Sequence, residues 1–169
     1  RCTSNYLQIN KTINSLDFEK IIIVYNYQEF KKFDYELEIF ENSANYFFET
    51  LNSFQYDDFI ITGQPVVWKE NLKNIIFKEI KLGNKNFDIK DSKYLIDNLF
   101  EYEESYKSLT NLFRYDYFSI IEFFCESGEC TRLSYENGKI QLFFEDASHL
   151  SSFSSDNIAK ELIKYMENN

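Results

Sequence analysis

Two cysteines lie five positions apart in the segment CESGEC, and strand-forming residues precede and follow them. If the four residues between Cys125 and Cys130 form a hairpin turn, the cysteines face each other across an antiparallel pair, where a Cα separation of about 4.5 to 5.5 Å is compatible with a disulfide. The pattern therefore predicts a Cys125–Cys130 bond. The alternative is two free thiols in a strand pair of a cytosolic protein. Zinc is a poor alternative, because tetrahedral coordination needs four ligands and no histidine or further cysteine is nearby.

The same region predicts a three-stranded antiparallel meander. Asn137-Gly138 favours a tight type I′ turn, because both residues tolerate positive φ. The predicted strands are Phe118–Cys125, Cys130–Tyr135 and Lys139–Glu145. This part of the chain should therefore be antiparallel, with short connections.

Hydrophobic periodicity predicts further strands and helices. The strand patterns are Lys20–Tyr27, Phe33–Glu41, Phe59–Trp68 and Ile76–Leu82, the first two forming an antiparallel pair. The helix patterns run from Asn42 or Ser43 to Phe54, from Asp91 to Phe113, and onward from Ser155 or Asp156. Gly63-Gln64-Pro65 predicts a bulged edge strand, because proline cannot donate to a central ladder. The order predicts one α+β domain, residues 1–169, with a mostly antiparallel sheet and inserted helices.

Composition and charge exclude several classes of function. Acidic residues number 28 against 18 basic ones, which gives a formal net charge of -10. The negative field disfavours binding to nucleic acid or to a membrane surface and favours a basic protein partner. The chain has only 4 glycines and no GxGxxG or GxxxxGK[ST] motif, so a P-loop nucleotide site is excluded. The alternative reading of the acid excess is that it only keeps an aromatic-rich chain soluble.

The chain begins at Arg1-Cys2 rather than at methionine. We expect that a preceding segment was removed, either by processing of a signal peptide or membrane anchor, or by the choice of an expressed fragment. With the predicted disulfide, this favours an extracytoplasmic location. The pattern assigns no role to Cys2.

His149 is the single histidine and the one candidate for base catalysis near neutral pH. The hydroxyl and carboxyl residues close to it in sequence are Asp146, Ser148, Ser151, Ser152 and Asp156. Such residues form catalytic triads, but no GxSxG motif is present, and a histidine in a polar connector is usually exposed to solvent. We therefore predict no catalytic residue, no metal ligand, no cofactor and no enzyme activity.

Tyrosines stand beside carboxylates in several segments. The candidate partner-binding residues are Asp34, Tyr35, Glu36, Glu38, Glu101, Tyr102 and Glu103. Tyrosine offers a large contact area at small entropy cost, and carboxylates attract lysine and arginine. The alternative is that these segments simply alternate between core and surface residues.

Small, acidic α+β chains rich in Tyr, Phe, Asn, Ile and Lys and lacking catalytic motifs resemble bacterial immunity proteins. With its cysteine-closed hairpin, the chain looks most like the TipC-type immunity proteins of Gram-positive bacteria, which antagonise secreted LXG-type toxins. The likeness covers size, composition and layout across the whole chain.

This resemblance implies stoichiometric occlusion of a toxin's active site, a cognate toxin with a basic surface, and an anchor at the outer face of the cell membrane. Two alternatives stay open. One is an extracellular or viral surface protein that binds a host factor, and the other is an acidic nucleic-acid mimic.

Overall fold

The structure is a computed structural model that describes residues 20–24, 37–53, 58–83 and 87–168. Tertiary contacts divide the chain into two compact units. Unit 1 comprises the described parts of Arg1–Gln64 and Tyr102–Phe118, and unit 2 those of Pro65–Glu101 and Ser119–Asn169. Helices and small sheets occur together, so the predicted α+β class is confirmed.

Unit 1 contains a three-stranded parallel sheet with the order β1-β2-β4. The central strand β2 (Phe59–Thr62) is buried at all four positions. A continuous apolar run is typical of a parallel strand that has neighbours on both sides. Its neighbours are β1 (Ile21–Val24) and β4 (Asp116–Phe118).

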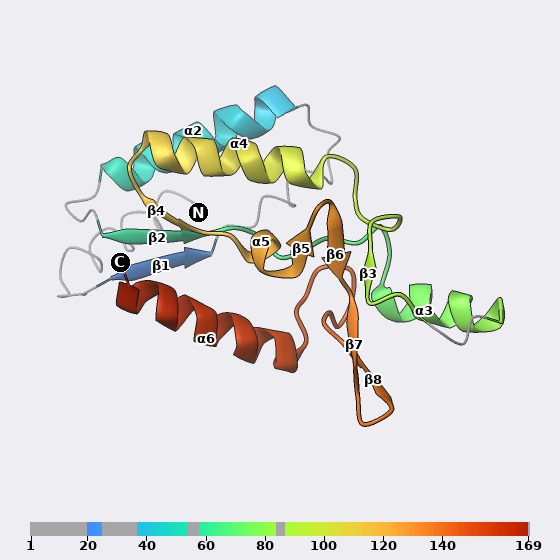
Figure 1. Cartoon of the computed structure of the whole chain (residues 1–169). Coiled ribbons are helices and arrows are strands. Elements are labelled where there is room, and N and C mark those ends of the chain that lie inside the picture. Colours follow the sequence, from blue (N-terminus) through green and yellow to red (C-terminus); the bar gives the residue numbers. More distant parts are fainter. Residues whose placement is uncertain (1–19, 25–36, 54–57, 84–86, 169) are drawn as a thin grey trace, which may run out of the picture. The chain divides into compact units, whose positions relative to one another are not determined.

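Two helices lie on the same side of this sheet, α2 (Leu37–Asn52) and α4 (Leu99–Leu112), as Figure 1 shows. Beneath them is an aromatic core centred on Phe48, which is fully buried. The Phe48 ring centroid lies 5.3 Å from those of Tyr106 and Phe113. Packing of these rings therefore joins both helices of unit 1.

Unit 2 consists of helices and short antiparallel strand pairs. Its strands form a three-stranded sheet of order β3-β6-β5 and a separate hairpin, β7-β8. They are β3 (Lys90–Asp91), β5 (Cys125–Glu126), β6 (Glu129–Thr131), β7 (Leu133–Glu136) and β8 (Lys139–Leu142). The helices are α3 (Leu72–Lys81), α5 (Ile120–Phe124) and α6 (Ser152–Asn168).

The two hairpin signals of the sequence are confirmed. Cys125 pairs with Cys130 across β5 and β6, and their Sγ atoms form a disulfide. The turn between them is the two-residue Ser127-Gly128, with φ of 54° and 84°, because the flanking glutamates pair with each other as part of the ladder. Asn137-Gly138 also has positive φ, 51° and 73°, and joins β7 to β8.

Two predicted strands are wrong. The described part of each segment is helical in the structure, because packing along the helix outweighs the local strand pattern. Residues 37–41 of the predicted strand Phe33–Glu41 belong to α2, and residues 76–81 of Ile76–Leu82 belong to α3. In α3 the buried residues are Leu72, Ile75 and Ile76, which share one helical face. Further along this segment, the apolar residues Ile80 and Leu82 are exposed to solvent.

The arrangement of the first sheet is also corrected. β1 pairs in parallel with β2. Of its predicted antiparallel partner, Phe33–Glu41, residues 33–36 lie outside the described residues and residues 37–41 are helical. β2 is the central strand, not a bulged edge, and it ends at Thr62, ahead of Pro65. Gly63 N still donates to Phe118 O at 3.0 Å, so the proline lies beyond the ladder and interrupts nothing.

Four further predicted elements differ from those of the structure. The helix predicted over Asp91–Phe113 begins only at Leu99, because Asp91 pairs with β6 and Asn98 takes a positive φ of 60°. The first strand of the predicted meander is the short helix α5, capped by Ser119, whose Oγ accepts from Glu122 N. The last helix starts at Ser152, earlier than predicted, and α2 runs from Leu37 to Asn52.

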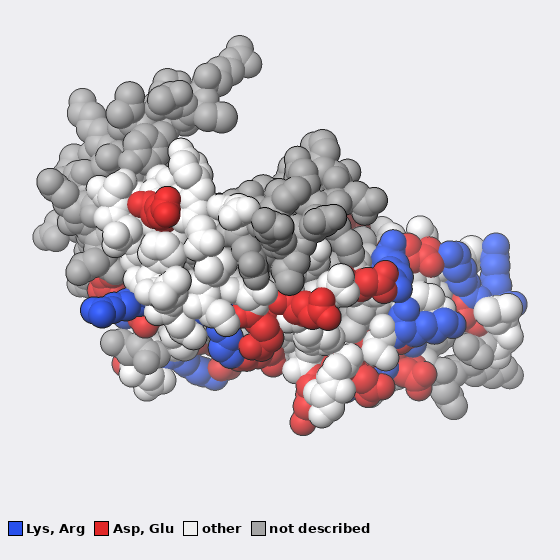
Figure 2. Space-filling view, turned by 90° about the horizontal axis from the view of Figure 1, so that it is seen from above, with Lys and Arg blue, Asp and Glu red and all other residues white. Residues whose placement is uncertain are grey.

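Lysine side chains of unit 2 gather over α3 (Figure 2). Lys73, Lys78 and Lys81 are all exposed there. Because the chain as a whole carries a net charge of -10, this helix has a local charge opposite to that of the molecule.

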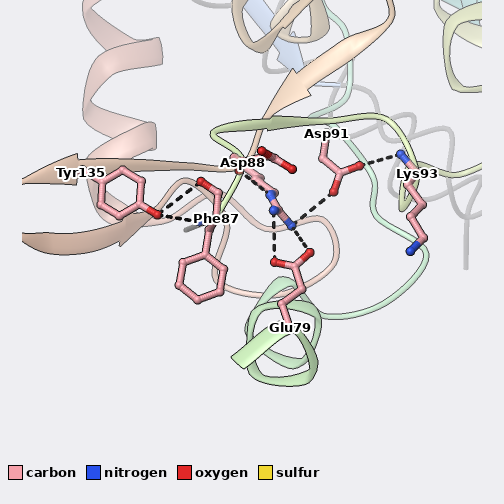
Figure 3. A network of polar contacts seen from close by, with 7 residues as sticks. Glu79, Phe87, Asp88, Asp91, Lys93 and Tyr135 are labelled. Carbon is pink, nitrogen blue, oxygen red and sulfur yellow. Dashed lines mark hydrogen bonds and ion pairs between the residues drawn. The ribbon is translucent and has the colours of Figure 1, made fainter. Parts of the chain in front are cut away.

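A buried arginine joins three segments of unit 2. Arg132 is 1% exposed, and its Nη1 lies 2.9 Å from Glu79 Oε1 and 3.3 Å from Asp91 Oδ2. Its Nε donates to the Asp88 carbonyl at 2.7 Å. Figure 3 shows Glu79 and Asp91 approaching the guanidinium from α3 and β3. All three contacts are charge-assisted, which is the condition under which a buried charge is tolerated.

We expect Arg132→Ala to lower the free energy of unfolding by about 3 to 5 kcal/mol, because it leaves Glu79 and Asp91 as uncompensated charges. The matched control is Lys73→Ala, which removes an ion pair with Glu145 whose side chains are 57% and 55% exposed. That change should cost about 0 to 1 kcal/mol. Urea unfolding followed by circular dichroism measures both, and equal losses would contradict the role given to Arg132.

Candidate functional site

The loop between β8 and α6, residues 143–151, holds the single histidine of the chain and is closed by main-chain hydrogen bonds. Glu145 N donates to His149 O at 2.8 Å, and Ser151 N donates to Phe143 O at 3.0 Å. From outside the loop, Trp68 N donates to the Ala147 carbonyl at 2.8 Å. The backbone around His149 is therefore held on both sides.

Asp146 occupies the tip of this loop and accepts three hydrogen bonds. Its Oδ1 accepts from the backbone N–H groups of Ser148, at 2.8 Å, and His149, at 2.9 Å, while Oδ2 lies 2.7 Å from His149 Nδ1. These backbone hydrogen bonds, with the His149 side chain adding to them, lower the pKa of Asp146 to about 2. The carboxylate is therefore ionised at neutral pH.

An ionised Asp146 determines which imidazole nitrogen carries hydrogen. A carboxylate only accepts, so Nδ1 of His149 must be the donor, and in the neutral ring Nε2 then carries the lone pair. The His149 side chain is 79% exposed, which confirms the predicted exposure and leaves Nε2 accessible from solvent. Chemically, this Asp–His pair can accept a proton from a hydroxyl group and stabilise the resulting imidazolium.

Two of the serines close to His149 in sequence are hydrogen-bonded to each other at the start of α6. Ser151 and Ser154 are buried, with their Oγ atoms 3.2 Å apart, and Ser151 Oγ accepts from Ser154 N at the start of α6. Ser152 and Asp156 are exposed on α6. Within the described part of the chain, the hydrogen bond of the His149 ring goes to Asp146 and to none of these serines.

Unit 1 has its own polar cluster at the carboxyl end of its parallel strands, the place where open α/β sheets bind ligands. Thr62 and Gln64 are 2% and 1% exposed, and Thr62 Oγ1 and both amide atoms of Gln64 have no hydrogen-bond partner among the described residues. A Cβ added to Gly63 would overlap the Tyr117 hydroxyl and lie 3.0 Å from Glu103 Oε2. Glycine therefore lets the buried Glu103 carboxylate and the buried hydroxyl of the partly buried Tyr117 approach the backbone closely.

Only some of the predicted partner-binding residues belong to the part of the chain that the structure describes. Asp34, Tyr35 and Glu36 lie outside the described residues, as does the side chain of Glu38. On α4, Glu101 is exposed, whereas Tyr102 is half-buried against the aromatic core. Glu103 is 3% exposed, so its carboxylate faces the polar cluster around Gly63 and not solvent.

The pairing of Asp146 with His149 is the feature that sequence reasoning did not recognise. The sequence shows the two residues only as neighbours in a polar connector. Aspartate readily forms turns in which its side chain accepts from backbone N–H groups two and three residues ahead, and this brings a side chain at i+3 against the same carboxylate. The spacing Asp-x-x-His was the available signal.

No family model matches the sequence, and no curated protein matches it significantly. Among solved structures, the fold is similar to the periplasmic domain of a lipopolysaccharide acetyltransferase from Salmonella ser. Paratyphi A, with a TM-score of 0.64. The two sequences are 16% identical over 88% of this chain, which spans 56% of the length of that domain. At this identity the similarity concerns the fold.

No three His, Cys, Asp or Glu side chains of the described residues converge in a way that could hold a metal ion. None of the helices in this part of the chain is long and apolar enough to cross a membrane. The disulfide is typical of an oxidising compartment, and with it the location is extracytoplasmic.

Gly63→Ala should destabilise the protein by about 1 to 3 kcal/mol, because the new methyl group overpacks a closed polar cluster. Replacing Tyr117 by phenylalanine in the same chain removes the hydroxyl that the methyl would overlap. The double variant should therefore recover part of the loss relative to the sum of the single changes. Thermal unfolding of the parent and the three variants measures this coupling, and strict additivity would contradict the described contact.

The lowered pKa of Asp146 predicts a pH-dependent contribution to stability. The unfolded-state value is near 3.8, so the contribution is fully present above about pH 4 and is lost as the pH falls toward 2. The difference in midpoint temperature between the parent and Asp146→Asn should be largest above pH 4 and should shrink below it. Calorimetry from pH 2 to 6 tests this, with Asp156→Asn, an exposed aspartate of α6, expected to show a small difference at every pH.

Proposed function

We propose that the chain is an extracytoplasmic domain that transfers or removes acyl groups on hydroxylated substrates, with His149 as general base and Asp146 as the residue that orients it. The observation that carries the proposal is the 2.7 Å contact between an ionised Asp146 and Nδ1 of His149, whose side chain is 79% exposed. The fold similarity to an acetyltransferase periplasmic domain supports the same class of reaction.

The chemistry assigns one proton transfer to the pair. His149 Nε2 takes the proton from a hydroxyl of the acceptor as the hydroxyl oxygen attacks the acyl carbonyl carbon. The new C–O bond forms as the bond to the donor's leaving group breaks, and the imidazolium returns its proton to that leaving group. Water in place of the acceptor gives hydrolysis by the same steps. Asp146 stabilises the imidazolium throughout but keeps its own charge.

We favour direct attack by the acceptor over a covalent acyl-enzyme. Within the described part of the chain, the hydrogen bond of the His149 ring goes to Asp146 and to none of the nearby serines. In this proposal the attacking hydroxyl therefore comes from the substrate.

The exposure of His149 indicates the size of that substrate. A ring that is 79% exposed on a loop can reach hydroxyl groups on the surface of a large molecule without enclosing it. A saccharide chain provides many such hydroxyls, and the similar periplasmic domain belongs to an enzyme whose name gives lipopolysaccharide as its substrate. We therefore propose a polysaccharide or glycolipid acceptor, processed by a domain that is anchored at the outer face of a membrane.

His149→Ala should lower the rate of acetyl transfer from 4-nitrophenyl acetate to a soluble saccharide by about 10² to 10⁴, the usual contribution of a general base. Asp146→Asn should also reduce it and should change the pH profile, because Nδ1 loses its acceptor. Ser152→Ala changes an exposed residue at the start of α6 and should leave the rate unchanged. Dialysis of the parent against a chelator should have no effect. A parent protein without turnover, or turnover that survives His149→Ala, would refute the proposal.

A second proposal, binding and neutralisation of a secreted toxin, is favoured by the net charge of -10 and by the exposed acids Glu101 and Glu104 on α4. It requires stoichiometric binding of a basic protein without turnover. Charge reversal at Glu101 should slow that association, and His149→Ala should leave it unchanged, which is the opposite ranking to the one expected for acyl transfer.

A further inference from the structure

Helix α3 presents an apolar outer face that the described residues of unit 2 leave exposed. Its inner face is packed, with Leu72 and Ile75 fully buried. On the outer side, Phe77 is 55% exposed, Ile80 52%, and Leu82, the residue that caps the helix, 82%. Large apolar side chains that gather at one exposed helix end are a common mark of an interaction surface.

Lysines surround these apolar side chains. Lys73 precedes Phe77 by one helical turn, and Lys81 follows it by another, with Nζ 4.5 Å from the centre of the Phe77 ring. Lys78 stands on the exposed side as well. The single acid of the helix, Glu79, is turned inward to the buried Arg132 and does not offset their charge at the surface.

Two of the three lysines already make ion pairs, but of a kind that exchanges readily. Lys73 contacts Glu145 and Lys78 contacts Glu70, with lysine side chains 57% and 60% exposed. Exposed pairs of this type contribute about 0 to 1 kcal/mol, so a phosphate can replace the carboxylate at little cost. The occupant must therefore be anionic and must also accept Phe77, Ile80 and Leu82 into an apolar layer.

We propose that the outer face of α3, formed by Phe77, Ile80, Leu82, Lys73, Lys78 and Lys81, docks on an anionic lipid surface. Exposed apolar residues bordered by lysines are the features by which helices lie in a membrane interface, with the rings and aliphatic chains among the acyl chains and the ammonium groups among the phosphates. The net charge of -10 opposes general adsorption, so the repulsion orients the molecule with α3 toward the lipid.

This surface contacts the loop 143–151, which carries His149. Lys73 Nζ lies 2.8 Å from Glu145 Oε2, and Glu145 N donates to His149 O. Because α3 and the 143–151 loop belong to the same compact unit, docking through α3 would place that loop near the lipid surface even where a phosphate replaces Glu145. The inference concerns membrane contact and stands or falls separately from the acyl-transfer chemistry.

Sedimentation with vesicles tests the proposal on the whole chain. The parent should bind vesicles of phosphatidylcholine mixed with phosphatidylglycerol and should bind phosphatidylcholine alone much more weakly. Raising the salt concentration should weaken binding to the anionic vesicles, because the charge contribution is screened. His149→Ala should bind like the parent, which separates this result from any loss of turnover.

Variants of α3 locate the surface. Lys78→Glu with Lys81→Glu should weaken binding by about fivefold or more per lysine charge removed, and Phe77→Ser with Ile80→Ser should abolish it. The matched control is on α6, where Ile163 is 50% exposed: Ile163→Ser with Lys160→Glu should bind like the parent. Far-UV circular dichroism verifies that each variant is folded.

Absence of binding to anionic vesicles would overturn the proposal, as would equal losses in the α3 and α6 variants. Binding of a soluble acidic polypeptide such as polyglutamate in preference to vesicles would overturn it too, because the surface would then be specific for a protein partner.

Discussion

The guanidinium of Arg132 is the contact on which the organisation of unit 2 depends. It is 1% exposed, and its ion pairs tie α3 to β3 through Glu79 and Asp91. The backbone of the same residue accepts from Phe143 N, where the histidine loop begins. A charge that costs several kcal/mol to bury is tolerated only when all its partners are in place, so it selects one arrangement of these segments.

The hydrogen bonds within the loop 143–151 orient the side chains of Asp146 and His149 without any ligand. Asp146 receives two backbone hydrogen bonds from its own turn, and this is enough to keep it ionised and to determine the tautomer of His149. Trp68 supports the turn from outside through the Ala147 carbonyl. The His149 ring is thus oriented by its own turn, and the turn by Trp68.

Sequence reasoning succeeded where short-range rules decide the structure. Cys125, Cys130 and Asn137-Gly138 fix their hairpins through turn chemistry alone. It failed where distant segments decide: the alternation of Ile76 to Leu82 resembles a strand until burial of Leu72 and Ile75 selects the helix. The parallel pairing of β2 with β4 joins residues more than fifty positions apart, and no local pattern indicates it. Asp146 and His149 were visible as residues, but their pairing depends on the geometry of the turn.

Interleaving of the two units has a consequence for how the chain can be divided. The backbone passes between them at residues 64 and 65, 101 and 102, and 118 and 119. β4, which completes the sheet of unit 1, is therefore synthesised only after a long segment of unit 2. Until then β2 has an unpaired edge, and apolar strand edges recruit other chains. Neither unit can be obtained by a single cut, and during biosynthesis the nascent polypeptide must keep an unfinished sheet from self-associating.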